Sequence, residues 1–160
     1  MGQKSQKTNV MRVLDRLKIS YRAHEYEPDP TRSGEEIAAI LGEDKERVFK
    51  TLVTRAASGQ YYVFIIPVAE ELDLKKAAKA AGEKSVSMLK QKELLPLTGY
   101  VHGGCSPIGM KKPFPSYIDA AALAGDRIFV SAGKVGCQVE LAPADLIAAA
   151  SLQTAELTAG

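Results

Sequence analysis

The segment formed by residues 103–109 holds the residue types with which this chain could perform chemistry. It reads Gly-Gly-Cys-Ser-Pro-Ile-Gly, so three glycines, one proline and one serine lie within seven residues. Glycine permits left-handed backbone and close approach to a ligand, whereas proline fixes its own φ and lacks an N–H. The segment therefore predicts a rigid loop whose N–H groups could receive a developing negative charge, as in an oxyanion hole. Glycine and proline also mark ordinary turns, and composition leaves that alternative open.

Lys50 favours the functional interpretation because it lies within an apolar strand predicted at residues 48–54. Side chains alternate along a strand, so Lys50 shares a face with Val48 and Leu52. An unpaired buried ammonium is costly, and Lys50 must therefore occupy a pocket or extend its stem to solvent. In a pocket, its charge could hold a phosphate or a carbonyl oxygen.

Four further side chains could react. His24 and His102 could be general bases, but neither has a Ser–Asp or Cys–Asp partner at a motif spacing. Cys105 is a candidate nucleophile, although a loop cysteine is inert unless its pKa is lowered. Tyr26 precedes a pair of prolines and could either pack or supply a pocket hydroxyl. Two cysteines and two histidines without ligand spacing predict no metal site.

Length and composition indicate a single domain. The chain has 160 residues, of which 46% are hydrophobic and 25% are charged, as in globular proteins with a core of their own. Its apolar runs are shorter than a membrane span, and its basic first residues precede no apolar signal region. Two cysteines do not make a disulfide framework, so we expect a cytoplasmic protein with reduced thiols that does not bind a membrane.

The net charge is only +2, but basic residues are concentrated in one part of the chain. Between residues 75 and 112 eight lysines are accompanied only by Glu83 and Glu93. This concentration suits a polyanion such as RNA, and a solvated surface is the alternative. The lysine band consists of Lys75, Lys76, Lys79, Lys84, Lys90, Lys92, Lys111 and Lys112.

Capping residues and apolar spacing predict the helices. Helices are expected to begin at Thr8, Ser33, Asp73 and Pro143, with a capping box between Ser33 and Glu36 and a helical turn over residues 91–95. Gly42 and Gly82 are expected to end two of them. The predicted inward positions of the first two helices are Val10, Val13, Leu14, Leu17, Ile37, Ile40 and Leu41.

Strands alternate with these helices, which predicts an α/β domain with a mixed sheet. The apolar run at residues 61–66 indicates a central strand covered on both faces, joined to the strand before it by a hairpin loop at 57–60. Residues 155–160 are expected to fray. The other strands are predicted at 19–26, 85–88, 117–118, 127–131 and 137–141.

Four segments in a fixed order closely resemble the YbaK family of free-standing trans-editing proteins, which is similar to the editing domain inserted in bacterial prolyl-tRNA synthetases. The resemblance extends from about the first helix to the Pro143 helix, and it is closest to the Cys-tRNA(Pro) deacylase branch. The segments are Val-Phe-Lys-Thr-Leu at 48–52, Leu-Lys-Lys-Ala-Ala-Lys at 74–79, Thr-Gly-Tyr-Val-His-Gly-Gly-Cys-Ser-Pro-Ile-Gly at 98–109 and Val-Ser-Ala-Gly-Lys at 130–134.

The resemblance implies one deacylase domain over residues 1–160, in which a mixed sheet curls into a partial barrel surrounded by helices. It implies hydrolytic release of cysteine from mischarged tRNA(Pro). Lys50 would contact the terminal nucleotide or the ester region, and Gly104 would offer its backbone to the aminoacyl carbonyl, whereas Cys105 receives no role. The matched positions that would line the small pocket are Tyr26, Gly103, Ser106, Pro107, Ser131 and Gly133.

The resemblance further implies that the substrate's own thiol attacks the carbonyl and forms a thiolactone, which would make the enzyme a hydrolase or a lyase. No cofactor is implied. The implied partner is aminoacyl-tRNA, and prolyl-tRNA synthetase is a candidate second partner. The alternatives are a deacylase for Ala-tRNA(Pro) or another aminoacyl-tRNA, a non-catalytic tRNA-binding regulator, and a conventional hydrolase that uses Cys105 with a histidine.

Overall fold

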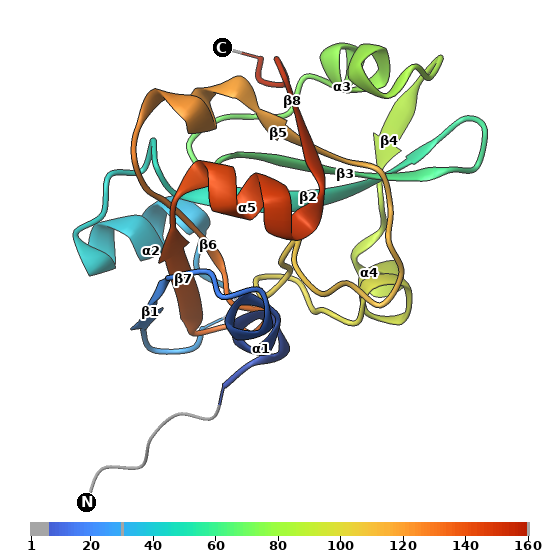
Figure 1. The fold of residues 1–160 in the computed structure, drawn as a ribbon. Coiled ribbons are helices and arrows are strands. Elements are labelled where there is room, and N and C mark those ends of the chain that lie inside the picture. The colour runs from blue at the N-terminus through green and yellow to red at the C-terminus, as the bar shows by residue number, and fades with distance from the viewer. Residues whose placement is uncertain (1–6, 30, 160) are drawn as a thin grey trace, which may run out of the picture.

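The computed structural model describes residues 7–29 and 31–159, which form two β-sheets with helices around them (Figure 1). One sheet has the strand order β4-β2-β3-β5-β8 and the other has the order β1-β7-β6. The strands are β1 (Arg22–Glu25), β2 (Phe49–Ala56), β3 (Tyr61–Pro67), β4 (Val86–Met88), β5 (Ser116–Asp119), β6 (Ile128–Ser131), β7 (Cys137–Leu141) and β8 (Leu152–Ala155).

The larger sheet is mixed, which confirms the predicted fold class. β2 and β3 form an antiparallel hairpin, whereas β3 and β5, and β5 and β8, run parallel. The two sheets meet at a single bridge between Val48 and Phe129, and the described strands do not close into a barrel.

The helices are α1 (Asn9–Arg16), α2 (Gly34–Leu41), α3 (Leu74–Ala81), α4 (Gln91–Thr98) and α5 (Pro143–Ala150), with a short 3-10 helix at Ala120–Ala124. Side-chain caps begin α1, α2 and α3, whereas α5 begins with Pro143 and α4 has no side-chain cap. Thr8 caps α1, Ser33 and Glu36 form the predicted capping box of α2, and Asp73 accepts hydrogen bonds from the first N–H groups of α3. Gly42 and Gly82 end their helices in the left-handed conformation, as predicted.

The sequence prediction is wrong about the burial of Leu17 and Ile40 and about the length of the first strand. Leu17 and Ile40 are 50% and 54% exposed, because the inward faces of the two short helices instead include Met11 and Ala38. The first strand spans only Arg22–Glu25 rather than residues 19–26.

The prediction that residues 155–160 fray is wrong for the described residues 155–159, which are held by contacts with distant parts of the chain. It begins as β8, and Leu157 is fully buried. The Leu157 N–H donates to Asp119 Oδ1 at 2.9 Å, and its carbonyl accepts from the Asp73 N–H at 2.8 Å. These long-range contacts override the local composition, and Gly160 lies outside the described residues.

The core occupies both faces of β3, as predicted for a central strand. Val63 and Ile65 belong to one buried cluster, and Phe64 and Ile66 belong to another.

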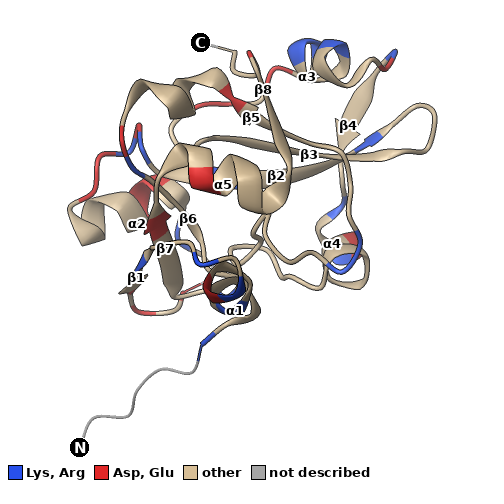
Figure 2. Cartoon of the chain, in the orientation of Figure 1, with Lys and Arg blue, Asp and Glu red and all other residues tan. Residues whose placement is uncertain are grey.

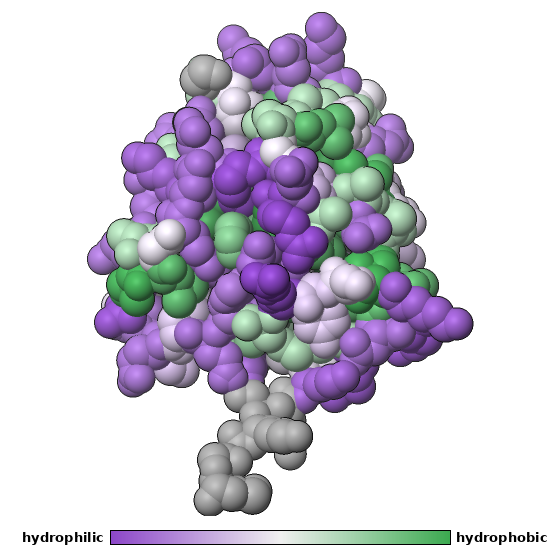
Figure 3. Space-filling view, turned by 60° about the vertical axis from the view of Figure 1, so that its left-hand side comes forward, coloured by the Kyte–Doolittle hydropathy of each residue, from purple (hydrophilic) through white to green (hydrophobic). Residues whose placement is uncertain are grey.

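On the molecular face that carries α2 and β1, hydrophobic residues form separate groups among hydrophilic ones (Figure 3). Within the described part of the chain, every helix is too short or too polar to cross a membrane.

The junction of the two sheets is built around Arg47 and Val48. The Arg47 carbonyl accepts from the Phe129 N–H at 2.9 Å, and the Val48 carbonyl accepts from the Val68 N–H at 2.8 Å. The Arg47 guanidinium lies 5.9 Å from the centre of the Phe49 ring. Its nitrogens donate at 2.7–3.1 Å to the carbonyls of Ala121, Ala122 and Arg127.

Replacing Arg47 with methionine is expected to lower the free energy of unfolding by about 2 kcal/mol, because a charged donor leaves three carbonyls. Urea unfolding at neutral pH measures the loss. Arg55→Met is the matched control, since Arg55 is exposed and its guanidinium lies over the Tyr61 ring at 6.0 Å. Equal losses in the two variants would show that the Arg47 hydrogen bonds do not hold the junction.

Candidate active site

A pocket of about 270 Å³ lies beside the junction of the two sheets. Four of the predicted site residues line it: Tyr26 after β1, Lys50 on β2, Gly103 in the glycine loop and Ser131 at the end of β6. The fold thus brings together residues from four separate parts of the chain. Four other predicted residues are not part of the lining, namely Gly104, Ser106, Pro107 and Gly133.

Lys50 is half-buried on β2, opposite Ile66 of β3. Its Nζ donates to the Val68 carbonyl at 3.4 Å, which is a long hydrogen bond. Among the described residues no carboxylate lies within ion-pair distance of this ammonium. The lysine therefore has most of its donor capacity available for a ligand in the pocket.

The glycine loop begins with a tight turn over residues 101–104. Gly103 has a φ of +86°, and the Gly104 N–H donates to the Val101 carbonyl at 3.0 Å. The Gly104 donor is thus already used. In the described part of the chain, the N–H groups of Gly103 and Cys105 have no acceptor, and both residues line the pocket.

Position 104 requires glycine because there is no space for a side chain. Its φ lies outside the left-handed region and would not by itself require glycine. A Cβ at this position would lie 2.9 Å from the backbone of Lys134 and of Val135. The glycine loop therefore packs directly against the turn between β6 and β7. That close approach fixes where Gly103 and Cys105 present their N–H groups.

The predicted residues outside the lining support those within it. The Gly133 N–H donates to Ser131 Oγ at 3.1 Å, and Gly133 has a φ of +98°. Ser106 is fully buried, and its Oγ accepts from the Ile108 N–H at 3.3 Å. Pro107 is buried in the same loop. These residues shape the loop and orient the Ser131 hydroxyl.

Cys105 lines the pocket but is a poor nucleophile. Burial raises the pKa of its thiol to about 12, so the thiol is protonated at neutral pH. Burial also raises the pKa of Tyr26. His102 lines the pocket and is exposed, whereas His24 Nε2 lies 2.7 Å from a Glu140 carboxylate oxygen. Among the described residues, no hydrogen bond joins Cys105 to a histidine.

Sequence reasoning did not assign four polar lining residues to the site, namely Arg32, Ser33, Thr51 and Gln138. Thr51 Oγ1 is buried without a hydrogen-bond partner among the described residues. Gln138 is only 5% exposed on β7. Its polar side chain between the apolar Cys137 and Val139 was the available signal, since buried amides require partners.

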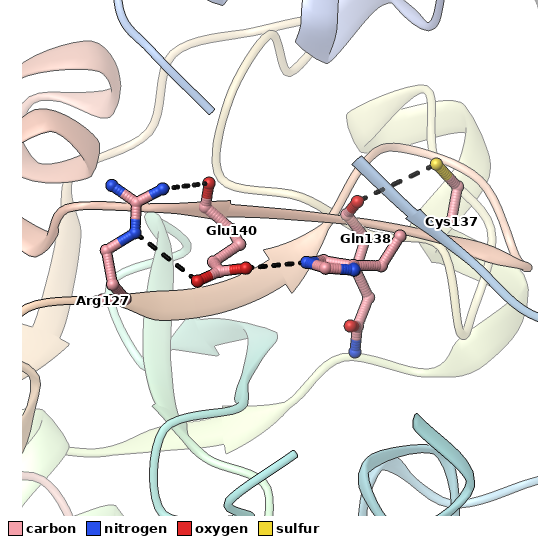
Figure 4. Close-up of polar contacts among 5 residues, drawn as sticks. Arg127, Cys137, Gln138 and Glu140 are labelled. Carbon is pink, nitrogen blue, oxygen red and sulfur yellow. Dashed lines mark hydrogen bonds and ion pairs between the residues drawn. The ribbon is translucent and has the colours of Figure 1, made fainter. Parts of the chain in front are cut away.

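A polar cluster lies behind Gln138. With its amide oriented to donate, Gln138 gives hydrogen bonds of 2.9 Å to both carboxylate oxygens of Glu43. Gln138 and Glu140 project from the same side of β7, and Glu140 also pairs with Arg127 at 3.5 Å (Figure 4). Although burial opposes it, the His24 hydrogen bond keeps the pKa of Glu140 low. Burial raises the pKa of Glu43 to about 6.

A second hollow of about 470 Å³ lies beside Arg47, and its lining includes the acidic residues Glu46, Glu70 and Asp119. Its central polar groups already have partners, because Arg47 binds three carbonyls and Asp119 accepts from the Ala121 and Leu157 N–H groups. The described residues include no cluster of three or more side chains suited to hold a metal ion.

Four residues of the lysine band lie on α3 and α4, which flank β4 (Figure 2), and Lys84 and Lys90 lie on either side of that strand. Seven of its lysines are exposed, and Lys76 is half-buried with its Nζ donating to the Thr158 carbonyl at 2.8 Å. Leu94 of α4 also lines the pocket. The basic surface therefore reaches the element that borders the site.

Among the described residues, the pocket combines a lysine without an ion-pair partner, backbone donors and a hydroxyl with no activated nucleophile, and this combination suits an ester or an anion. Residues 28–149 match the aminoacyl-tRNA editing domain family. The chain belongs to this family, which confirms the resemblance to YbaK proteins.

Particular relatives agree with this assignment. The chain is 48% identical to EbsC of Enterococcus faecalis, named as a Cys-tRNA(Pro)/Cys-tRNA(Cys) deacylase, over 96% of this chain and 94% of that protein. It is 30% identical to the prolyl-tRNA editing protein ProX of Acetoanaerobium sticklandii, over 65% and 63% of the two chains. A structure described as a trans-editing enzyme for prolyl tRNA synthetase superposes with a TM-score of 0.81 at 27% identity, covering 98% and 100%.

The Glu43 carboxyl should make stability depend on pH. Its pKa rises from 4.5 to about 6 on folding, so the folded state binds this proton more tightly than the unfolded state. Compared with Glu43→Gln, the natural protein should lose free energy of unfolding as the pH rises from below 4.5 to above 6. Urea unfolding across this range measures the difference, with Glu27→Gln as an exposed control. A difference that does not change with pH would contradict the raised pKa.

Proposed function

We propose that this protein is a trans-editing deacylase that releases cysteine from mischarged Cys-tRNA(Pro), with residues 1–160 acting as one domain in the cytoplasm. The observation that carries the proposal is the pocket, in which Lys50 and the glycine loop meet without a nucleophile–base pair. Family membership and the similarity to a protein named as a Cys-tRNA deacylase support the substrate class. Prolyl-tRNA synthetase would supply this substrate, and a complex with it remains a prediction.

An aminoacyl ester needs little activation, because its carbonyl is already electrophilic. We assign the carbonyl oxygen to N–H groups of the glycine loop, and the free donors at Gly103 and Cys105 are better placed for this than the engaged N–H of Gly104. One donor to a developing oxyanion contributes about 3 kcal/mol. Lys50 would add its charge at the ester or at the terminal nucleotide.

The substrate supplies the nucleophile in this mechanism. The cysteine thiolate attacks its own ester carbonyl, the bond to the ribose oxygen breaks, and that oxygen takes a proton. A thiolactone leaves and water then opens it to cysteine. Proximity within the substrate lowers the barrier without a protein nucleophile. The high pKa of Cys105 favours this route over a conventional cysteine hydrolase.

Two other functions remain as alternatives. A deacylase for Ala-tRNA(Pro) would use the same pocket but cannot use a substrate thiol. A non-catalytic regulator would bind tRNA through the lysine band and leave the ester intact. A panel of aminoacyl-tRNAs incubated with the purified protein separates these alternatives from the proposed deacylase.

Lys50→Met should reduce release of cysteine from Cys-tRNA(Pro) by about 100-fold, because the variant keeps the apolar stem but loses the charge at the ester. The assay measures the labelled cysteine that remains on the tRNA. Lys45→Met is the matched control, since Lys45 is exposed and pairs only loosely with Glu35 at 3.8 Å. Full activity of Lys50→Met with an unchanged melting temperature would remove Lys50 from the site.

Ser-tRNA(Pro) should bind the same pocket but react far more slowly than Cys-tRNA(Pro). A hydroxyl is almost wholly protonated at neutral pH, whereas a few per cent of a thiol is thiolate. Rapid quenching and mass spectrometry should detect the thiolactone before free cysteine. Equal rates for the two substrates, with free cysteine as the first product, would mean that water attacks directly.

A further inference from the structure

Arg32 is a second cationic side chain of the Lys50 pocket. It lies in the segment that leads into α2, and its side chain is 30% exposed. Lys50 lies on β2, lines the same pocket and is half-buried. Two positive groups around one concave site repel each other unless an anion lies between them.

The backbone around Arg32 is fixed by short-range hydrogen bonds. Asp29 Oδ1 accepts from the Thr31 N–H at 3.0 Å and from the Thr31 hydroxyl at 2.6 Å. The Arg32 N–H donates to the Asp29 carbonyl at 3.1 Å, and Ser33 begins the capping box of α2. The position of Arg32 at the pocket is therefore set before a ligand binds.

The guanidinium itself is only weakly engaged. Among the described residues its ion-pair partner is Asp29, whose Oδ2 lies 3.8 Å from Arg32 Nε. The hydrogen bonds from Thr31 keep the pKa of Asp29 low and occupy its other oxygen. Most of the five N–H donors of Arg32 are thus available, as are those of Lys50.

The chemistry of the substrate determines which anion fits. An aminoacyl ester is neutral at its carbonyl and positive at its amino group, so the nearest negative group is the phosphate that links the terminal nucleotide. A planar guanidinium matches a phosphate with two parallel hydrogen bonds, whereas an ammonium acts as a point charge. Arg32 is the better match for the phosphate, and Lys50 is left for the ester region.

We infer that Arg32 binds the phosphate on the 5′ side of the terminal adenosine of tRNA. The inference rests on the proposed function and adds a residue that distinguishes esters carried on nucleic acid from free aminoacyl esters. Arg32 acts as a binding residue and takes no part in the attack on the carbonyl. Its contribution should therefore depend on the presence of the phosphate.

Binding tests the inference independently of activity. Adenosine and adenosine 5′-methyl phosphate differ by one singly charged phosphodiester and are the two probes. Calorimetry should show that Arg32→Gln weakens binding of the phosphate probe about tenfold and leaves adenosine unaffected. Arg32→Lys should recover part of the loss. Arg22→Gln is the control, since Arg22 is an exposed arginine on β1 outside the pocket.

Activity is the second measurement, made on the 3′-cysteinyl esters of the same two probes. Arg32→Gln should lower kcat/KM only for the ester that carries the phosphate. Equal losses on both esters, equal affinities of the natural protein and Arg32→Gln for the phosphate probe, or equal effects of Arg22→Gln would overturn the inference. If the natural protein binds the phosphate probe through Arg32 but cleaves neither these esters nor Cys-tRNA(Pro), the proposed function fails and the phosphate site stands.

Discussion

The bridge between Val48 and Phe129 is the constraint on which the site depends. It is a parallel pairing, and the residues two positions further along the chain from it, Lys50 and Ser131, both line the pocket. Arg47 secures the bridge, because its carbonyl holds Phe129 and its guanidinium holds three further carbonyls. Residues of both sheets line the pocket beside this junction, among them Lys50 of β2 and Gln138 of β7.

Close backbone packing at the other side of the pocket also fixes the positions of site residues. Gly104 lies against the turn at Lys134 and Val135 with no room for a Cβ. The Gly103 and Cys105 N–H groups are thereby held in place, and no described residue supplies an acceptor for them, which leaves polar groups unpaired in a partly buried site. Such preorganised donors need no reorganisation when charge develops on a carbonyl oxygen.

Local signals in the sequence predicted much of the fold. Thr8, Ser33 and Asp73 cap their helices as expected, because a capping bond joins residues only three positions apart. The exposure of Ile40 and the burial of Leu157 depend on distant partners, and periodicity does not record those. Lys50 was predictable as a polar residue in an apolar strand. The engaged N–H of Gly104 and the pocket position of Arg32 follow only from the tertiary structure.

Among the described residues, Lys50 has no ion-pair partner and Arg32 has only the 3.8 Å pair with Asp29, and the rest of the fold makes this tolerable. A carboxylate beside Lys50 would stabilise the empty protein, but it would also compete with any phosphate or oxyanion for the ammonium. The carboxylates of the polar cluster behind Gln138 are instead paired with other groups, since Glu43 accepts from Gln138 and Glu140 binds His24 and Arg127. The lysine is half-exposed, so water limits the cost of its unpaired charge until a ligand replaces that water. A rigid junction with paired acidic groups behind it thus leaves the positive charge of the pocket available to a substrate that brings its own negative charge.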